Sequence, residues 1–158
     1  MSQFEHRFQI VVAAVPAEVH ALLSDPEVLP ELHPLIERVW ITERTRTADG
    51  ELLRFGLFER IPLGSIRFPN RYRGEIRKRD GDTSQLKLRG ESWPAVTTHV
   101  RFRFEPVSAG TAVEEDLVVS APAPLLPFVA KTAVEAHRRQ LEAVRERFAG
   151  AAGARRPA

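Results

Sequence analysis

The chain of 158 residues contains no cysteine, and this absence removes several kinds of chemistry at once. Without cysteine there are no disulfide bonds, no thiolate metal ligands and no cysteine nucleophile. The first residues also lack the apolar core of a signal peptide, and no stretch approaches the roughly 18 apolar residues of a membrane span. These three absences fit a protein of the reducing cytoplasm, so we predict a cytoplasmic location and no transmembrane segment.

Familiar catalytic and cofactor motifs are missing as well. The five histidines are scattered, with no familiar metal-ligand spacing among them: His6, His20, His33, His99 and His137. There is no glycine-rich phosphate loop, and the G-x-S-x-G signature of serine hydrolases is absent. We therefore predict no metal site and no cofactor, and any catalysis would have to be acid–base chemistry by ordinary side chains.

The chain also lacks a strong excess of one charge, because it has 23 Lys and Arg and 21 Asp and Glu, for a net charge of +2. Arginines such as Arg67, Arg71 and Arg73 concentrate on the predicted outer faces of strands, but acidic residues share those faces. A nucleic-acid surface would also need aromatic residues among the arginines, and most aromatics fall on the opposite face. We expect no nucleic-acid partner, whereas contact with an acidic protein or an anionic membrane surface stays open.

What the chain does contain is a series of strand-like segments between two short helices and one long helix. Alternation predicts a first strand over residues 4–12, followed by short helices over 17–23 and 27–32. From residue 36 onward the period is two, and turn residues separate six candidate strands: 37–46, 52–61, 66–78, 84–92, 95–105 and 111–120. A helical period then runs from Pro124 to about Phe148. We expect a single domain over residues 1–149 and a disordered tail over 150–158.

Two pairs of short stretches carry a resemblance to a known superfamily. They are VPAEV (15–19) with LSDPE (23–27), and FRFEP (102–106) with GTAV (110–113), which leads into the long helix. Together with the order of elements they resemble the Bet v 1-like or START-related superfamily, also called SRPBCC, which includes polyketide cyclase/dehydratase-like proteins. The resemblance implies an α+β helix-grip fold, in which a curved seven-stranded antiparallel sheet wraps around a long C-terminal helix. Two short helices follow its first strand, and a cavity between sheet and helix binds hydrophobic molecules such as lipids, sterols or polyketide-like compounds.

Alternation along each strand predicts which side chains face that cavity. Strand 37–46 is ambiguous, with Val39 and Ile41 on one face and Trp40 on the other. The remaining inner positions are mostly aliphatic and aromatic with a few polar groups, which is the usual lining of a small-molecule site. The predicted ligand-binding residues are Phe8, Phe55, Leu57, Glu59, Phe68, Asn70, Tyr72, Leu88, Thr98, Val100, Phe102, Glu115, Leu117, Val134 and His137.

Three polar members of this set are also the catalytic candidates, namely Glu115, His137 and Tyr72. A carboxylate in the apolar register of a strand is costly to bury without a partner, and a histidine on the sheet-facing stripe of the last helix is a possible one. Glu115 and His137 therefore form either a structural pair or a functional site. Tyr72 is either a core residue with its hydroxyl tied to the backbone or a functional hydroxyl, and Glu59 either lines the cavity or points past its rim.

Three functions remain open at this point. The favoured reading is a protein that binds or carries a small hydrophobic or amphipathic molecule, because the predicted lining is apolar and no catalytic motif is present. The first alternative is a cyclase/dehydratase-like enzyme, in which His137, Glu115 and Tyr72 supply a base, an acid and an enolate-stabilising hydroxyl. The second alternative is an interaction module whose basic outer face binds a protein.

Overall fold

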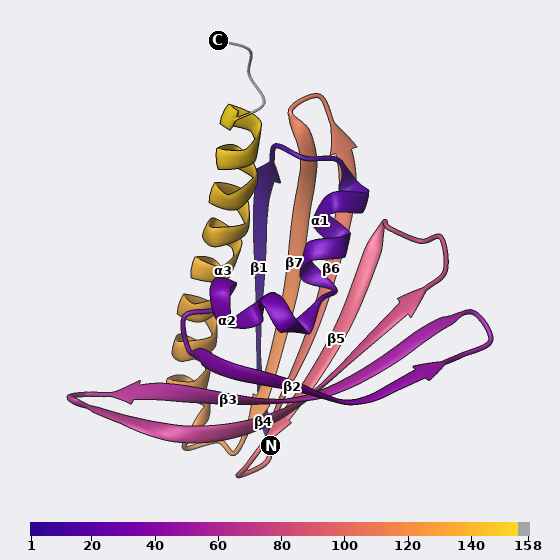
Figure 1. Ribbon diagram of the computed structural model, residues 1–158. Helices are drawn as coiled ribbons and strands as arrows, with labels where there is room; N and C mark the ends of the chain where they lie inside the picture. Colours follow the sequence, from indigo (N-terminus) through magenta and orange to yellow (C-terminus); the bar gives the residue numbers. More distant parts are fainter. Residues whose placement is uncertain (155–158) are drawn as a thin grey trace.

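The computed structural model describes residues 1–154 and confirms the α+β helix-grip architecture (Figure 1). Two short helices and a 3₁₀ helix follow the first strand, six strands come next, and a long helix ends the described chain. The elements are β1 (Ser2–Val12), α1 (Pro16–Leu23), η1 (Pro26–Val28, the 3₁₀ helix), α2 (Leu29–Leu32), β2 (Ile36–Arg46), β3 (Gly50–Leu63), β4 (Ile66–Arg79), β5 (Gln85–Ser92), β6 (Val96–Val107), β7 (Gly110–Ala121) and α3 (Leu126–Ala154).

The seven strands form one antiparallel sheet in the order β1-β7-β6-β5-β4-β3-β2. Figure 1 shows that the sheet is strongly curved, because β2, β3 and β4 cross the view almost at right angles to β1, β7 and β6. Helix α3 packs against β1 and β7, α1 packs against β6 and β7, and α2 contacts both β2 and α3. The helices therefore cover the concave face unevenly, with α3 held against one side of the sheet.

The alternation in the sequence places the core where it was predicted. Along β7, Val113, Leu117 and Val119 are almost completely buried on the concave side, and the residues that alternate with this face are half-exposed. The outer positions carry charged side chains joined by ion pairs, such as Arg7 with Asp116 at 2.6 Å. A strand in which every second residue is apolar buries those residues in the core and leaves the charged residues between them in solvent.

Strand β2 resolves the ambiguity seen in its sequence. Val39 and Ile41 are half-buried on the concave side, whereas Trp40 is 43% exposed on the outer face. The register between β2 and β3 shifts twice, once between Ile36 and Arg38 and once between Ile41 and Glu43. Each shift inserts one extra residue into β2, so β2 is a bulged strand at the edge of the sheet.

Three predicted element bounds need correction. The short helix expected over 27–32 is split, because the Asp25 side chain accepts a hydrogen bond from the Glu27 backbone at 3.0 Å and starts the 3₁₀ helix η1 ahead of α2. The long helix begins at Leu126 rather than Pro124, after a turn over 123–125. It also continues through Ala154, since its alanine-rich end favours the helix, so the tail expected to be disordered from Gly150 is helical over 150–154. Positions 155–158 lie outside the described residues.

Candidate functional site

A cavity of about 520 Å³ lies between the concave face of the sheet and α3. Its wall comes mainly from β3, β4, β5, β6 and the first half of α3, with residues of α2 and of the segment after it at one side. The volume lies within the range typical of small-molecule sites. Predicted residues found in its lining are Phe55, Leu57, Glu59, Phe68, Asn70, Tyr72, Leu88, Thr98, Val100, Phe102 and His137.

Four predicted residues are not part of the lining, and the packing of α3 explains why. Phe8 and Leu117 belong to β1 and β7, the two strands on which the helix packs directly. Their side chains therefore join the hydrophobic core, where Leu117 is completely buried and Phe8 is partly buried. Val134 of α3 is half-buried, and Glu115 of β7 is completely buried behind His137.

Two glycines shape the wall of the cavity by letting aromatic rings lie flat on the strands. A Cβ atom at Gly74 would lie 2.3 Å from Cζ of Phe55, and one at Gly90 would lie 2.0 Å from Cε1 of Tyr72. Gly74 and Gly90 are also register partners in the pairing of β4 with β5. Neither was predicted from the sequence, although a glycine inside a strand is a known sign of a close approach by another group.

The Tyr72 hydroxyl is held in place by a hydrogen bond with Thr98 Oγ1 at 2.6 Å. Its partner is therefore another residue of the cavity lining and not the backbone. Burial raises the pKa of Tyr72, with the Thr98 hydrogen bond opposing the shift. Tyr72 is therefore a neutral hydroxyl at the cavity wall.

The second polar group is the pair formed by Glu115 and His137, which the sequence placed as possible partners. Glu115 is completely buried, its Oε1 contacts Nδ1 of His137, and its Oε2 has no hydrogen-bond partner within the described residues. The His137 side chain is 15% exposed and lines the cavity. Burial lowers the pKa of His137, but the charge and hydrogen bond of Glu115 and the charge of Glu59 outweigh it, so the net shift is upward. Glu115, buried behind His137, thus favours the charged form of the imidazole at the cavity wall.

His33 is a lining residue that sequence reasoning missed. Its ring meets the edge of the His137 ring with 5.7 Å between centroids, and its Nδ1 accepts a hydrogen bond from the Leu35 backbone at 3.4 Å. Burial lowers the pKa of His33 to about 3, and the charge of His137 adds to this shift. A neutral ring whose Nδ1 is an acceptor carries its proton on Nε2, so His33 is a neutral hydrogen-bond donor. It follows a four-residue helix, where no periodic pattern could indicate its orientation.

Glu59 and Asn70 form the third polar group. The Asn70 amide donates to Oε1 of Glu59 at 2.7 Å, and both side chains line the cavity instead of pointing past its rim. Burial raises the pKa of Glu59 more than the Asn70 hydrogen bond and the charge of His137 lower it, so the net shift is upward. The two residues are register partners in the β3–β4 hairpin, which fixes their contact.

Exposed apolar side chains mark the mouth of the cavity. Trp93, in the turn between β5 and β6, is 86% exposed, and Leu125, just before α3, is 38% exposed, yet both belong to the lining. Both were absent from the predicted site because turn residues have no alternation to assign them to a face.

Within residues 1–154, no group of three or more His, Cys, Asp or Glu side chains is arranged to hold a metal ion. In the same part of the chain, no helix has the length and apolar character needed to cross a membrane.

Comparison with known proteins places these features in a family context. A family profile described as polyketide cyclase/dehydrase and lipid transport matches residues 3–151. Comparison with curated protein sequences returns no significant match.

Several solved structures share the fold. A protein from Thermus thermophilus is 21% identical with a TM-score of 0.72, and the match covers 93% of this chain and 98% of that one. The Zhui aromatase/cyclase from Streptomyces sp. R1128 is 15% identical with a TM-score of 0.70, over 92% and 93% of the two chains. A START superfamily protein from Mycobacterium smegmatis is 19% identical with a TM-score of 0.64, over 94% and 97%. At these identities the likeness shows the fold alone.

Proposed function

The chain belongs to the polyketide cyclase/dehydrase and lipid transport family, and from that premise we propose that it binds a small hydrophobic or amphipathic molecule between the sheet and α3. The observation that carries the proposal is the cavity of about 520 Å³, whose wall is mostly aliphatic and aromatic. Its few polar groups are gathered around Tyr72, His137 and Glu59. A largely apolar cavity with a few convergent polar groups is the usual form of a binding site for such molecules.

Burial of apolar surface would supply most of the affinity, at about 25 cal/mol for each Å² removed from water. The polar groups would contribute orientation more than affinity, because each is already hydrogen-bonded within the protein. The exposed Trp93 and Leu125 at the mouth would contact the ligand as it enters.

The first test is native mass spectrometry of the purified protein. A discrete adduct that is lost on denaturation would show an occupied cavity, and its mass would identify the compound. A clean mass for the protein alone would argue against a carrier that keeps its ligand permanently bound.

A cavity-filling variant makes the test specific to this site. Ala133 lines the cavity from α3, so Ala133→Phe should displace both a co-purifying molecule and the neutral dye Nile red. Ala109→Phe adds the same side chain in the exposed β6–β7 turn and should change neither. Equal Nile red binding by the two variants would contradict binding in this cavity.

Acid–base catalysis in the same cavity is a second candidate, and the position of His137 favours it. The neutral imidazole of His137 would take the proton from the carbon next to the carbonyl, while the neutral Tyr72 hydroxyl would donate to the enolate oxygen that forms. The resulting imidazolium, stabilised by Glu115, would return this proton to the leaving hydroxyl, so that water departs and no other acid or base is needed. Glu115 would act as a positioning residue, because it reaches the cavity only through His137. The corresponding reaction is loss of water from a β-hydroxy ketone to give a conjugated enone.

This candidate can be tested with 4-hydroxy-4-phenylbutan-2-one, whose dehydration produces a strongly absorbing enone. His137→Asn should lower the rate by about 10²-fold or more while Nile red binding is kept. Binding of the ketone to the unchanged protein without any turnover would favour the binding function alone.

A further inference from the structure

The charged groups around the cavity are unequally distributed. Glu59 faces the cavity and Glu115 lies directly behind its wall, whereas His137, which lines the cavity, is already paired with Glu115. Among the described lining residues, the only lysine or arginine is Arg89. Its side chain is exposed on the outer face of β5 and pairs with Glu91 at 2.5 Å, so it offers no charge to the interior.

We infer that the cavity selects ligands that carry no negative charge and possess a hydrogen-bond donor, which Glu59 accepts, and that it rejects carboxylate and phosphate groups. This inference deepens the proposed function and rests on it. Neutral alcohols and phenols and cationic amines would bind, whereas fatty acids and phospholipid head groups would not.

Glu59 is prepared for this role by its neighbour. Asn70 holds one carboxylate oxygen at 2.7 Å, and Oε2 has no hydrogen bond with the part of the chain that the structure describes. Because Glu59 lines the cavity and only its Oε1 is bound by Asn70, a hydroxyl or ammonium group of a ligand can donate to its second oxygen.

The imidazolium of His137 does not reverse this preference. Its charge is already matched by Glu115, which contacts its Nδ1. His33, the other lining histidine, is neutral and supplies a hydrogen bond but no charge. An anionic ligand would therefore meet Glu59 in the cavity wall and Glu115 behind it, with no unpaired cationic side chain among the described lining residues to offset them.

The test compares four probes with the same ring system by isothermal titration calorimetry near neutral pH. They are 2-naphthylmethanol, 2-naphthylmethylamine, 2-naphthoate and the unfunctionalised 2-methylnaphthalene. The alcohol and the amine should bind at least about tenfold more tightly than the carboxylate. Glu59→Gln keeps the size of the side chain and removes its charge. In this variant naphthoate should gain affinity, and the alcohol and the amine should bind only about threefold more tightly than naphthoate, or less.

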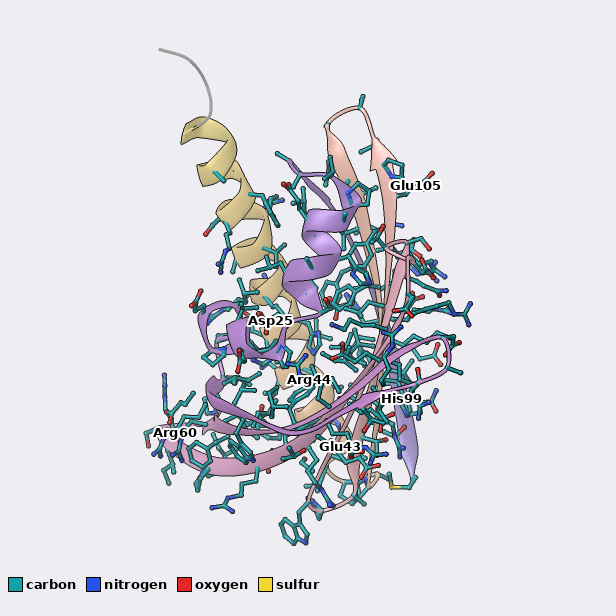
Figure 2. The ribbon with its side chains drawn as sticks, turned by 45° about the vertical axis from the view of Figure 1, so that its right-hand side comes forward. Asp25, Glu43, Arg44, Arg60, His99 and Glu105 are labelled. Carbon is teal, nitrogen blue, oxygen red and sulfur yellow. The ribbon has the colours of Figure 1, made fainter. Side chains whose placement is uncertain are left out.

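Glu105→Gln is the matched control, because it removes one negative charge from an exposed position near the β6–β7 turn (labelled in Figure 2). It should leave the ranking of all four probes unchanged. Naphthoate binding as tight as the alcohol, or discrimination that survives in Glu59→Gln, would overturn the inference while leaving the binding function intact. If none of the four binds, 2-methylnaphthalene included, the binding function itself fails and the inference falls with it.

Discussion

Replacing His137 with leucine should destabilise the protein strongly, because it would leave a buried carboxylate with no partner. Glu115 is completely buried, and its other oxygen already has no hydrogen bond within the described residues. Removing one member of a buried ion pair typically costs about 3–5 kcal/mol. With a urea m-value of about 2 kcal/mol/M for a small protein, the unfolding midpoint followed by circular dichroism should fall by about 2 M.

The same reasoning predicts that the second substitution repairs the first. When Glu115→Leu is added to His137→Leu, no buried charge remains, and the free energy of unfolding should return to within about 1 kcal/mol of the original or exceed it. Arg139→Leu is the control on the same helix. It breaks the exposed pair of Arg139 with Glu135 at 3.0 Å, which should cost less than about 1 kcal/mol.

The pH dependence gives an independent check. The pKa of His137 is raised in the folded protein, so the stabilisation is fully present below the unfolded value of about 6.5 and is lost as the pH rises through the folded value. The free energy of unfolding should therefore fall on the alkaline side of pH 6.5, and His137→Leu should lack this slope. The reasoning about the buried pair would be refuted if His137→Leu lowered the free energy of unfolding by less than about 1 kcal/mol. It would also be refuted if the double variant were no more stable than His137→Leu alone.

Two further predictions concern the wall of the cavity and the outer face of the sheet. Gly90→Ala should destabilise the protein by about 1–3 kcal/mol in urea unfolding, because the added methyl group would lie 2.0 Å from a ring carbon of Tyr72; an unchanged midpoint would show that the ring has room to move. Three arginines of the outer face have no ion-pair partner within residues 1–154, namely Arg67, Arg71 and Arg73. Replacing all three by glutamate should change the free energy of unfolding by less than about 1.5 kcal/mol in total. If the alternative of an interaction module holds, that variant should lose affinity for an identified acidic partner by surface plasmon resonance while Nile red binding stays the same.

The fold was predictable from the sequence because each strand carries its own apolar face. The prediction weakened at β2, and the structure shows the physical reason. Glu37 and Thr42 are extra residues at the two register shifts, so Ile36, Val39 and Ile41 face inward at unequal spacing. A period-two pattern with two interruptions cannot assign a face along the whole strand.

The candidate site was predictable where it lies on regular strands and unpredictable where it depends on packing. Alternation placed Tyr72 and Glu59 at the cavity, and the cost of burying a carboxylate indicated that Glu115 needed a partner such as His137. His33 and Trp93 lie in connecting segments, where no pattern fixes the direction of a side chain. The identity of the ligand depends on the shape of the cavity, which no local pattern of residues encodes.

The two bulges in β2 also bear on how copies of the protein behave at high concentration. The sheet is open, with β1 and β2 as its two edges, and β1 lies beside α3. The other edge would be a template for a strand from a second copy if it were flat and apolar. The bulges at Glu37 and Thr42 interrupt the row of free amide and carbonyl groups, and Glu43 and Arg44 add charge along it (Figure 2). Irregular pairing within the molecule therefore protects β2 from aggregation between molecules.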